Sequence, residues 1–182
     1  ILAGHARMFK TQWHHFVRHT EEKWGTEKAL ELAYALGYTM GDGGWQYIEK
    51  VYGKPFPINK LPWYQDYIHM LYGPDTHAYT WHDEEKAVCT RHGCLFRPSG
   101  DIDPSRAKFC RTYCDGYIDA YMDVEPDLYC IRVPDMGDNC EETRCIHLWT
   151  YDKKVIENLP QALKDGIRGT TRERLIRNGA NL

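Results

Sequence analysis

The chain has 182 residues, which is long enough for one domain with its own hydrophobic core. Hydrophobic residues make up 42% of the chain, and six Trp and thirteen Tyr are among them, a composition that excludes intrinsic disorder. The net charge of −3, with Lys and Arg scattered along the chain, excludes the basic patch of a nucleic-acid-binding protein. No run of about 18 apolar residues is present, so we expect no membrane span.

The N-terminal part, residues 1–75, is predicted to be helical. Apolar residues recur at helical spacing over residues 9–36, with an interruption near Gly25. Thr26 is a candidate cap for a second helix, and Gly37 is a candidate C-terminal stop. Three further segments follow: a turn at residues 41–44, a short helix over 45–53 and another helix over 63–73.

The next part, residues 76–150, changes to the alternating pattern of strands. It predicts a hairpin around the turn His82–Glu85, and two further strands over residues 128–133 and 143–151. Asp103 followed by Pro104 indicates the start of a helix that runs to Asp123.

These elements predict an α+β fold, in which a helical N-terminal half packs with a four-stranded antiparallel sheet and one long helix. Residues 1–75 and 76–150 then belong to the same domain. Residues 151–182 are polar and predict an extended C-terminal arm that needs a partner surface. Through this arm we expect a homo-oligomer or a subunit of a larger complex.

All seven cysteines lie between Cys89 and Cys145. An odd number in a chain of this size favours a reduced, cytoplasmic protein whose thiols serve a site, a metal or the core. Two of these thiols, Cys110 and Cys114, are four residues apart on one face of the predicted helix, and Asp115 and Asp119 form a neighbouring row. This spacing fits either a buried apolar face or a thiol and a carboxylate directed at one small molecule.

Two other segments could place a thiol beside polar groups. Cys89 and Cys94 flank Arg91 and His92, whose positive charges would favour a reactive thiolate. The second segment is the turn Gly137–Glu142, where Asn139 and Cys140 sit among backbone N–H groups that suit an oxyanion or a substrate carboxylate.

A zinc ion or an iron–sulfur cluster would use Cys89, Cys94, Cys110 and Cys114. No Cys-x2-Cys pair occurs, so neither cofactor is favoured. His15, His19 and Glu22 share a helix face that could hold a divalent metal, but a solvated polar face explains them better.

The order of these elements resembles the L-2-amino-thiazoline-4-carboxylic acid hydrolase family over residues 10–150. The resemblance depends on Cys114 with Asp115 or Asp119 in the helix, and on the segment Gly137–Glu141 before the last strand. It implies an enzyme that opens a thiazoline ring at a C–S bond on the way to N-carbamoyl-cysteine. The chain departs from the family pattern at Cys140-Glu141-Glu142-Thr143, and by its additional Cys94, Cys110 and Cys145.

We therefore expect a cysteine-dependent hydrolase or lyase that acts on a small substrate with a C–N or C–S bond. In this mechanism the thiolate of Cys114 or Cys140 attacks an amidine-like carbon, and Asp119 or His92 moves the proton. The predicted substrate-binding residues are Asp115, Tyr121, Asn139 and Trp81. The alternatives are a metal-binding module, and a non-catalytic subunit that docks through residues 151–182.

Overall fold

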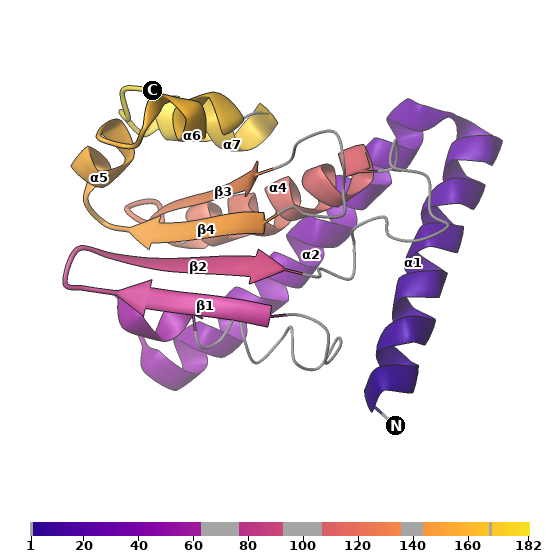
Figure 1. Cartoon of the computed structure of the whole chain (residues 1–182), viewed down its shortest axis with the longest axis horizontal. Coiled ribbons are helices and arrows are strands. Elements are labelled where there is room, and N and C mark those ends of the chain that lie inside the picture. Colours follow the sequence, from indigo (N-terminus) through magenta and orange to yellow (C-terminus); the bar gives the residue numbers. More distant parts are fainter. Residues whose placement is uncertain (1, 63–76, 93–106, 136–143, 168) are drawn as a thin grey trace.

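A four-stranded antiparallel sheet forms the centre of the molecule in the computed structural model, and helices α2 and α4 cross one of its faces (Figure 1). The structure describes residues 2–62, 77–92, 107–135, 144–167 and 169–182. The predicted α+β fold is confirmed. The strands are β1 (His77–His82), β2 (Lys86–His92), β3 (Tyr129–Asp135) and β4 (Arg144–Thr150). The helices are α1 (Leu2–Trp24), α2 (Thr26–Tyr52), the 3-10 turn η1 (Ile58–Lys60), α4 (Ala107–Val124), α5 (Lys153–Glu157), α6 (Gln161–Gly166) and α7 (Gly169–Arg177).

The strands lie in the order β1-β2-β4-β3, and all neighbours are antiparallel. The predicted hairpin is β1 and β2, and its turn is fixed by Asp83, whose carboxylate accepts hydrogen bonds from the backbone N–H groups of Glu85 and Lys86. The predicted helix start at Asp103 and the predicted helix over 63–73 lie outside the described residues. Among the helices that the structure describes, none is long and apolar enough to cross a membrane.

Helix α2 does not stop at Gly37, and the glycines at positions 41–44 do not form a turn. The helix runs through both, because α2 packs so closely on α4 that side chains would not fit between them. A Cβ atom on Gly37 would lie 1.8 Å from the backbone oxygen of Tyr113, and one on Gly41 would lie 2.4 Å from that of Tyr117. Contacts between the two backbones therefore outweigh the helix-breaking tendency of glycine.

Residues 151–182 are not an extended arm. They form α5, α6 and α7, which lie along the β3 side of the sheet (Figure 1). Four of their apolar side chains belong to the main hydrophobic core, so this segment covers a surface of its own chain. The docking role predicted for this segment depended on an extended arm, and the structure shows helices in its place. The four side chains are Ile156, Ile167, Leu175 and Ala180.

Two buried clusters hold the layers together. The larger one lies between the sheet, the C-terminal halves of α2 and α4, and the last three helices, and it contains Trp45, Tyr121 and Trp149. The smaller one joins α1 to the first halves of α2 and α4, and Trp13 meets Tyr113 edge-to-face there, with ring centroids 5.3 Å apart. Helix α4 contributes to both clusters, so it is the element on which the candidate site is built.

Candidate functional site

A buried arginine, Arg132, lies between β3 and α4. Its side chain shares the face of β3 with Cys130 and is only 5% exposed. One guanidinium nitrogen, Nη2, lies 3.6 Å from Cys110 Sγ on α4 and 3.5 Å from Cys145 Sγ on β4. Among the described residues, no carboxylate lies within the 4.0 Å of an ion pair with Arg132. A cation in this position is costly unless anionic groups compensate it.

Three cysteines surround the guanidinium of Arg132, and the backbone oxygen of Arg111 accepts a hydrogen bond from its Nη1 at 3.5 Å. Burial acts to lower the pKa of Arg132, but electrostatic attraction to Cys114, Cys145 and Cys110 outweighs burial, and the pKa ends well above its usual value. Cys110 and Cys145 are fully buried, whereas Cys114 is partly exposed. Of these three thiols, Cys114 is therefore the one that a small molecule could reach. We refer to Arg132 with Cys110, Cys114 and Cys145 as the thiol–arginine cluster.

Asp115 follows Cys114 on α4 and is partly buried. Burial raises the pKa of Asp115 to about 6, although nearby Arg132 acts to lower it, and Asp119 raises it further. Helix α7 begins next to this carboxyl, since a Cβ atom on Gly169 would lie 3.4 Å from Asp115 Oδ2. A carboxyl group with this pKa exchanges its proton near neutral pH, which suits a general acid or base.

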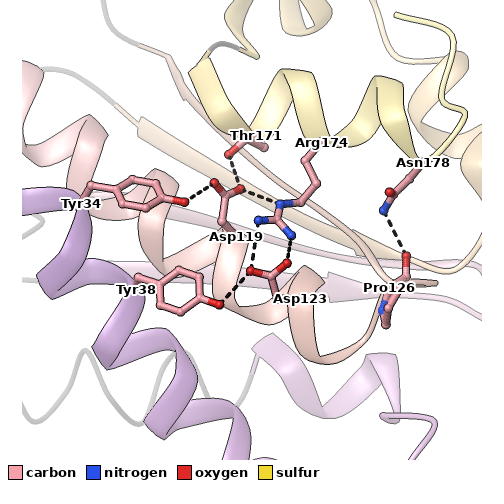
Figure 2. Close-up of polar contacts among 8 residues, drawn as sticks. All are labelled: Tyr34, Tyr38, Asp119, Asp123, Pro126, Thr171, Arg174 and Asn178. Atoms are coloured by element: carbon pink, nitrogen blue, oxygen red, sulfur yellow. Dashed lines mark hydrogen bonds and ion pairs between the residues drawn. The ribbon is translucent and has the colours of Figure 1, made fainter. Parts of the chain in front are cut away.

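The next carboxyl along α4, Asp119, is fully buried in a polar network (Figure 2). The Tyr34 hydroxyl donates a hydrogen bond to it at 2.8 Å, and the Thr171 hydroxyl donates another at 3.4 Å. Arg174 of α7 forms an ion pair with Asp119, with Nε 3.4 Å from Oδ1. Asp119 thus joins α2, α4 and α7 through its two oxygens.

Arg174 also binds Asp123, one turn further along α4. Two of its guanidinium nitrogens donate hydrogen bonds to the Asp123 carboxylate, and Tyr38 donates a third at 2.8 Å (Figure 2). These hydrogen bonds, that of Arg174 above all, lower the pKa of Asp123. Each oxygen of Asp119 and Asp123 therefore has a partner within this network, which gives Asp119 a structural role as the ionic attachment of α7.

Two of the remaining predicted site residues, Tyr121 and Trp81, have side chains within the described part of the structure. Tyr121 is fully buried in the main core, 5.5 Å from the Trp45 ring, and its hydroxyl is 2.7 Å from that of Tyr117. Trp81 is 52% exposed on β1, the edge strand furthest from β3, and Lys86 lies over its ring. Cys140 and Asn139 lie outside the described residues, and His92 ends β2 with a side chain that is not described.

Three of the four cysteines predicted as metal ligands lie within the described residues. Cys89 is buried on β2, Cys110 and Cys114 are on α4, and Cys94 lies outside the described residues. Within the described ranges, no three His, Cys, Asp or Glu side chains are grouped so that they could hold a metal ion. His15 lies on the exposed side of α1 and accepts a hydrogen bond from Arg18 at 2.8 Å.

Sequence reasoning missed Arg132, Arg174 and Cys145 as members of these networks. Arg132 had a signal, since alternation along β3 puts it on the same face as the apolar Cys130 and Leu128. A charged residue at an inward position needs a partner, and that need could have singled it out. Arg174 had no comparable signal, because its partners Asp123 and Asp119 lie 51 and 55 residues before it in the sequence.

In comparisons with known proteins, no protein-family model, no curated protein and no solved structure matches the chain.

Proposed function

We propose that the chain is a cysteine-dependent hydrolase or lyase that breaks a C–N or C–S bond in a small substrate, with Cys114 as the nucleophile. The observation that carries the proposal is the thiol–arginine cluster: a buried guanidinium within 3.6 Å of the sulfurs of Cys110 and Cys145, which the partly exposed Cys114 also attracts electrostatically. A guanidinium stabilises a negatively charged sulfur beside it, and the thiolate is the nucleophilic form of cysteine.

The roles of the other residues follow from their positions. The sulfur of Cys114 forms a bond to the electrophilic carbon, and protonated Asp115 gives its proton to the leaving nitrogen or sulfur. Asp115 then accepts a proton from the water that cleaves the carbon–sulfur bond to the enzyme, which restores both groups. Arg132 stabilises the anionic sulfur or a carboxylate of the substrate. We transfer the proton-moving role from Asp119 to Asp115, since Arg174 already holds Asp119.

The resemblance to thiazoline-carboxylate hydrolases supplies the first substrate class to test, a five-membered ring that contains sulfur and carries a carboxylate. A reducing cytoplasm is the compartment that we propose, and it is supported by Cys114, Cys130 and Cys145, which form no disulfide bond among the described residues.

The proposal is tested first by the reactivity of individual thiols. At neutral pH and with iodoacetamide in small excess, peptide mass spectrometry should find Cys114 alkylated before the other four described cysteines. Arg132→Met should slow the alkylation of Cys114. Arg111→Met, which removes a cation from α4, the helix that carries Cys114, should not slow it. Incubation with 2-amino-thiazoline-4-carboxylate should then yield a free-thiol product, and Cys114→Ser should abolish that yield. Cys114 alkylation no faster than that of a buried thiol, with no product, would contradict the proposal.

A further inference from the structure

Arg111 is a cation of α4 that lies beside the proposed nucleophile and has no role yet. It precedes Cys114 by three residues and Asp115 by four, so both are its neighbours on the helix surface, with Cβ atoms about 5–6 Å apart. All three side chains are partly exposed. They therefore form one patch on α4 in which a thiol, a carboxyl and a guanidinium are adjacent.

The guanidinium of Arg111 has no polar partner among the described residues. Its Nε atom is buried and makes no hydrogen bond, and none of the ion pairs in the described part of the chain involves Arg111. By contrast Lys108, the other cation of α4, is paired with Glu21 at 3.0 Å. A buried donor that has left water without gaining an acceptor is destabilising. An acceptor supplied by a ligand would therefore be stabilising at Arg111.

The charges around this patch are unbalanced. Nη1 of Arg132 donates a hydrogen bond to the backbone oxygen of Arg111 at 3.5 Å, so two arginines meet at this turn of α4. Both act to lower the pKa of Asp115. The next carboxyl, Asp119, is already paired with Arg174. Two permanent positive charges thus face one carboxyl, and an anionic ligand would neutralise the excess.

We propose that Arg111 binds a carboxylate of the substrate and so selects anionic small molecules for reaction at Cys114. This inference rests on the proposed function, because it takes Cys114 as the nucleophile. The planar fork of N–H groups on a guanidinium matches the two oxygens of a carboxylate. Arg132, whose Nη2 contacts the sulfurs of Cys110 and Cys145, is then left to stabilise the anionic sulfur.

Two alkylating reagents that differ in charge test this role. Iodoacetate carries a carboxylate and iodoacetamide does not, and both react with the same thiolate. The rate constants at Cys114 are measured by peptide mass spectrometry at neutral pH and constant ionic strength. Their ratio, iodoacetate over iodoacetamide, should exceed that of N-acetylcysteine amide by about tenfold, the factor that about 1.4 kcal/mol supplies. Arg111→Met should return the ratio to that of the model thiol by slowing iodoacetate alone.

Lys108→Met is the matched control, because it removes the other cation of the same helix. It should leave the ratio at Cys114 unchanged. An equal fall of the ratio in Lys108→Met and Arg111→Met would show only the general charge of α4 and would overturn the proposal. So would a ratio in Arg111→Met that equals the wild-type ratio. Partial unfolding of a variant does not imitate the expected result, because it changes the rates of both reagents together.

A second measurement does not depend on the reactivity of Cys114. Replacing sodium chloride with sodium acetate at equal ionic strength should raise the urea midpoint of unfolding more in the wild type than in Arg111→Met, because acetate binds the folded state at Arg111. The general effect of the salt on folding is the same in both chains. Slow alkylation of Cys114 by iodoacetamide would refute the nucleophile alone. An equal rise of the two midpoints would overturn Arg111 as the carboxylate site.

Discussion

The contact between α2 and α4 gives the sharpest prediction, because the same substitution at two glycines of one helix should have opposite effects. In Gly37→Ala, the new Cβ atom would lie 1.8 Å from the Tyr113 backbone oxygen, against the 3.0 Å that real Cβ atoms keep, an overlap of 1.2 Å. Both partners are helix backbone, so neither can turn aside, and the two helices must separate. In Gly43→Ala the methyl group enters open space.

The expected magnitudes follow from these distances. Both variants gain about 1 kcal/mol of helix propensity. Gly37→Ala also loses the close packing along the helix pair, which we expect to cost about 3 kcal/mol or more, as severe overpacking does. Urea unfolding, followed by circular dichroism, should show Gly43→Ala as more stable than the wild type and Gly37→Ala as less stable. A free energy of unfolding for Gly37→Ala that equals that of Gly43→Ala would refute the close approach of the two helices.

Two further predictions concern the aspartates of α4. Arg174→Met leaves Asp119 buried without its cation and should lower the free energy of unfolding by about 3 kcal/mol. Adding Asp119→Asn should recover part of that loss; no recovery would show that Arg174 does not act through this carboxylate. Asp115 has a pKa of about 6 in the folded chain, so the folded state keeps its proton between about pH 4 and 6 and stability falls as pH rises through that window. Asp115→Asn should remove this fall in the free energy of unfolding, which amounts to about 3 kcal/mol at neutral pH. If the free energies of unfolding of variant and wild type changed in parallel from pH 4 to 7, the result would contradict the burial of this group.

Where a residue's conformation depends on its near neighbours, the sequence was sufficient. Alternation through Ala87, Val88 and Cys89 identified a strand, because side chains in a sheet point alternately to its two faces. The acidic turn after His82 closed the predicted hairpin, since Asp83 binds its own backbone two and three residues on. The helical spacing of Cys110 and Cys114 likewise placed both thiols on one side of α4.

The candidate site was predicted only in part, for the same reason. Sequence reasoning found Cys114 and Asp115 as neighbours, because a helix fixes their relation locally. It assigned Asp119 to catalysis, because nothing near residue 119 in the sequence shows that Arg174 and Thr171 return to bind it. It missed Arg132 because the sulfurs that surround the guanidinium come from α4 and β4, and a local pattern does not contain that neighbourhood.

By itself the sequence determined the α+β class, the hairpin and the main helix, since hydrophobic periodicity is a local property that survives in any packing. Only the tertiary structure decided that the glycines of α2 lie inside a helix, because their tolerance depends on the backbone of α4. It also decided that residues 151–182 fold onto their own chain. A polar segment with few apolar residues is stable only against a surface made elsewhere, and here Asp119, Asp123 and the core provide that surface.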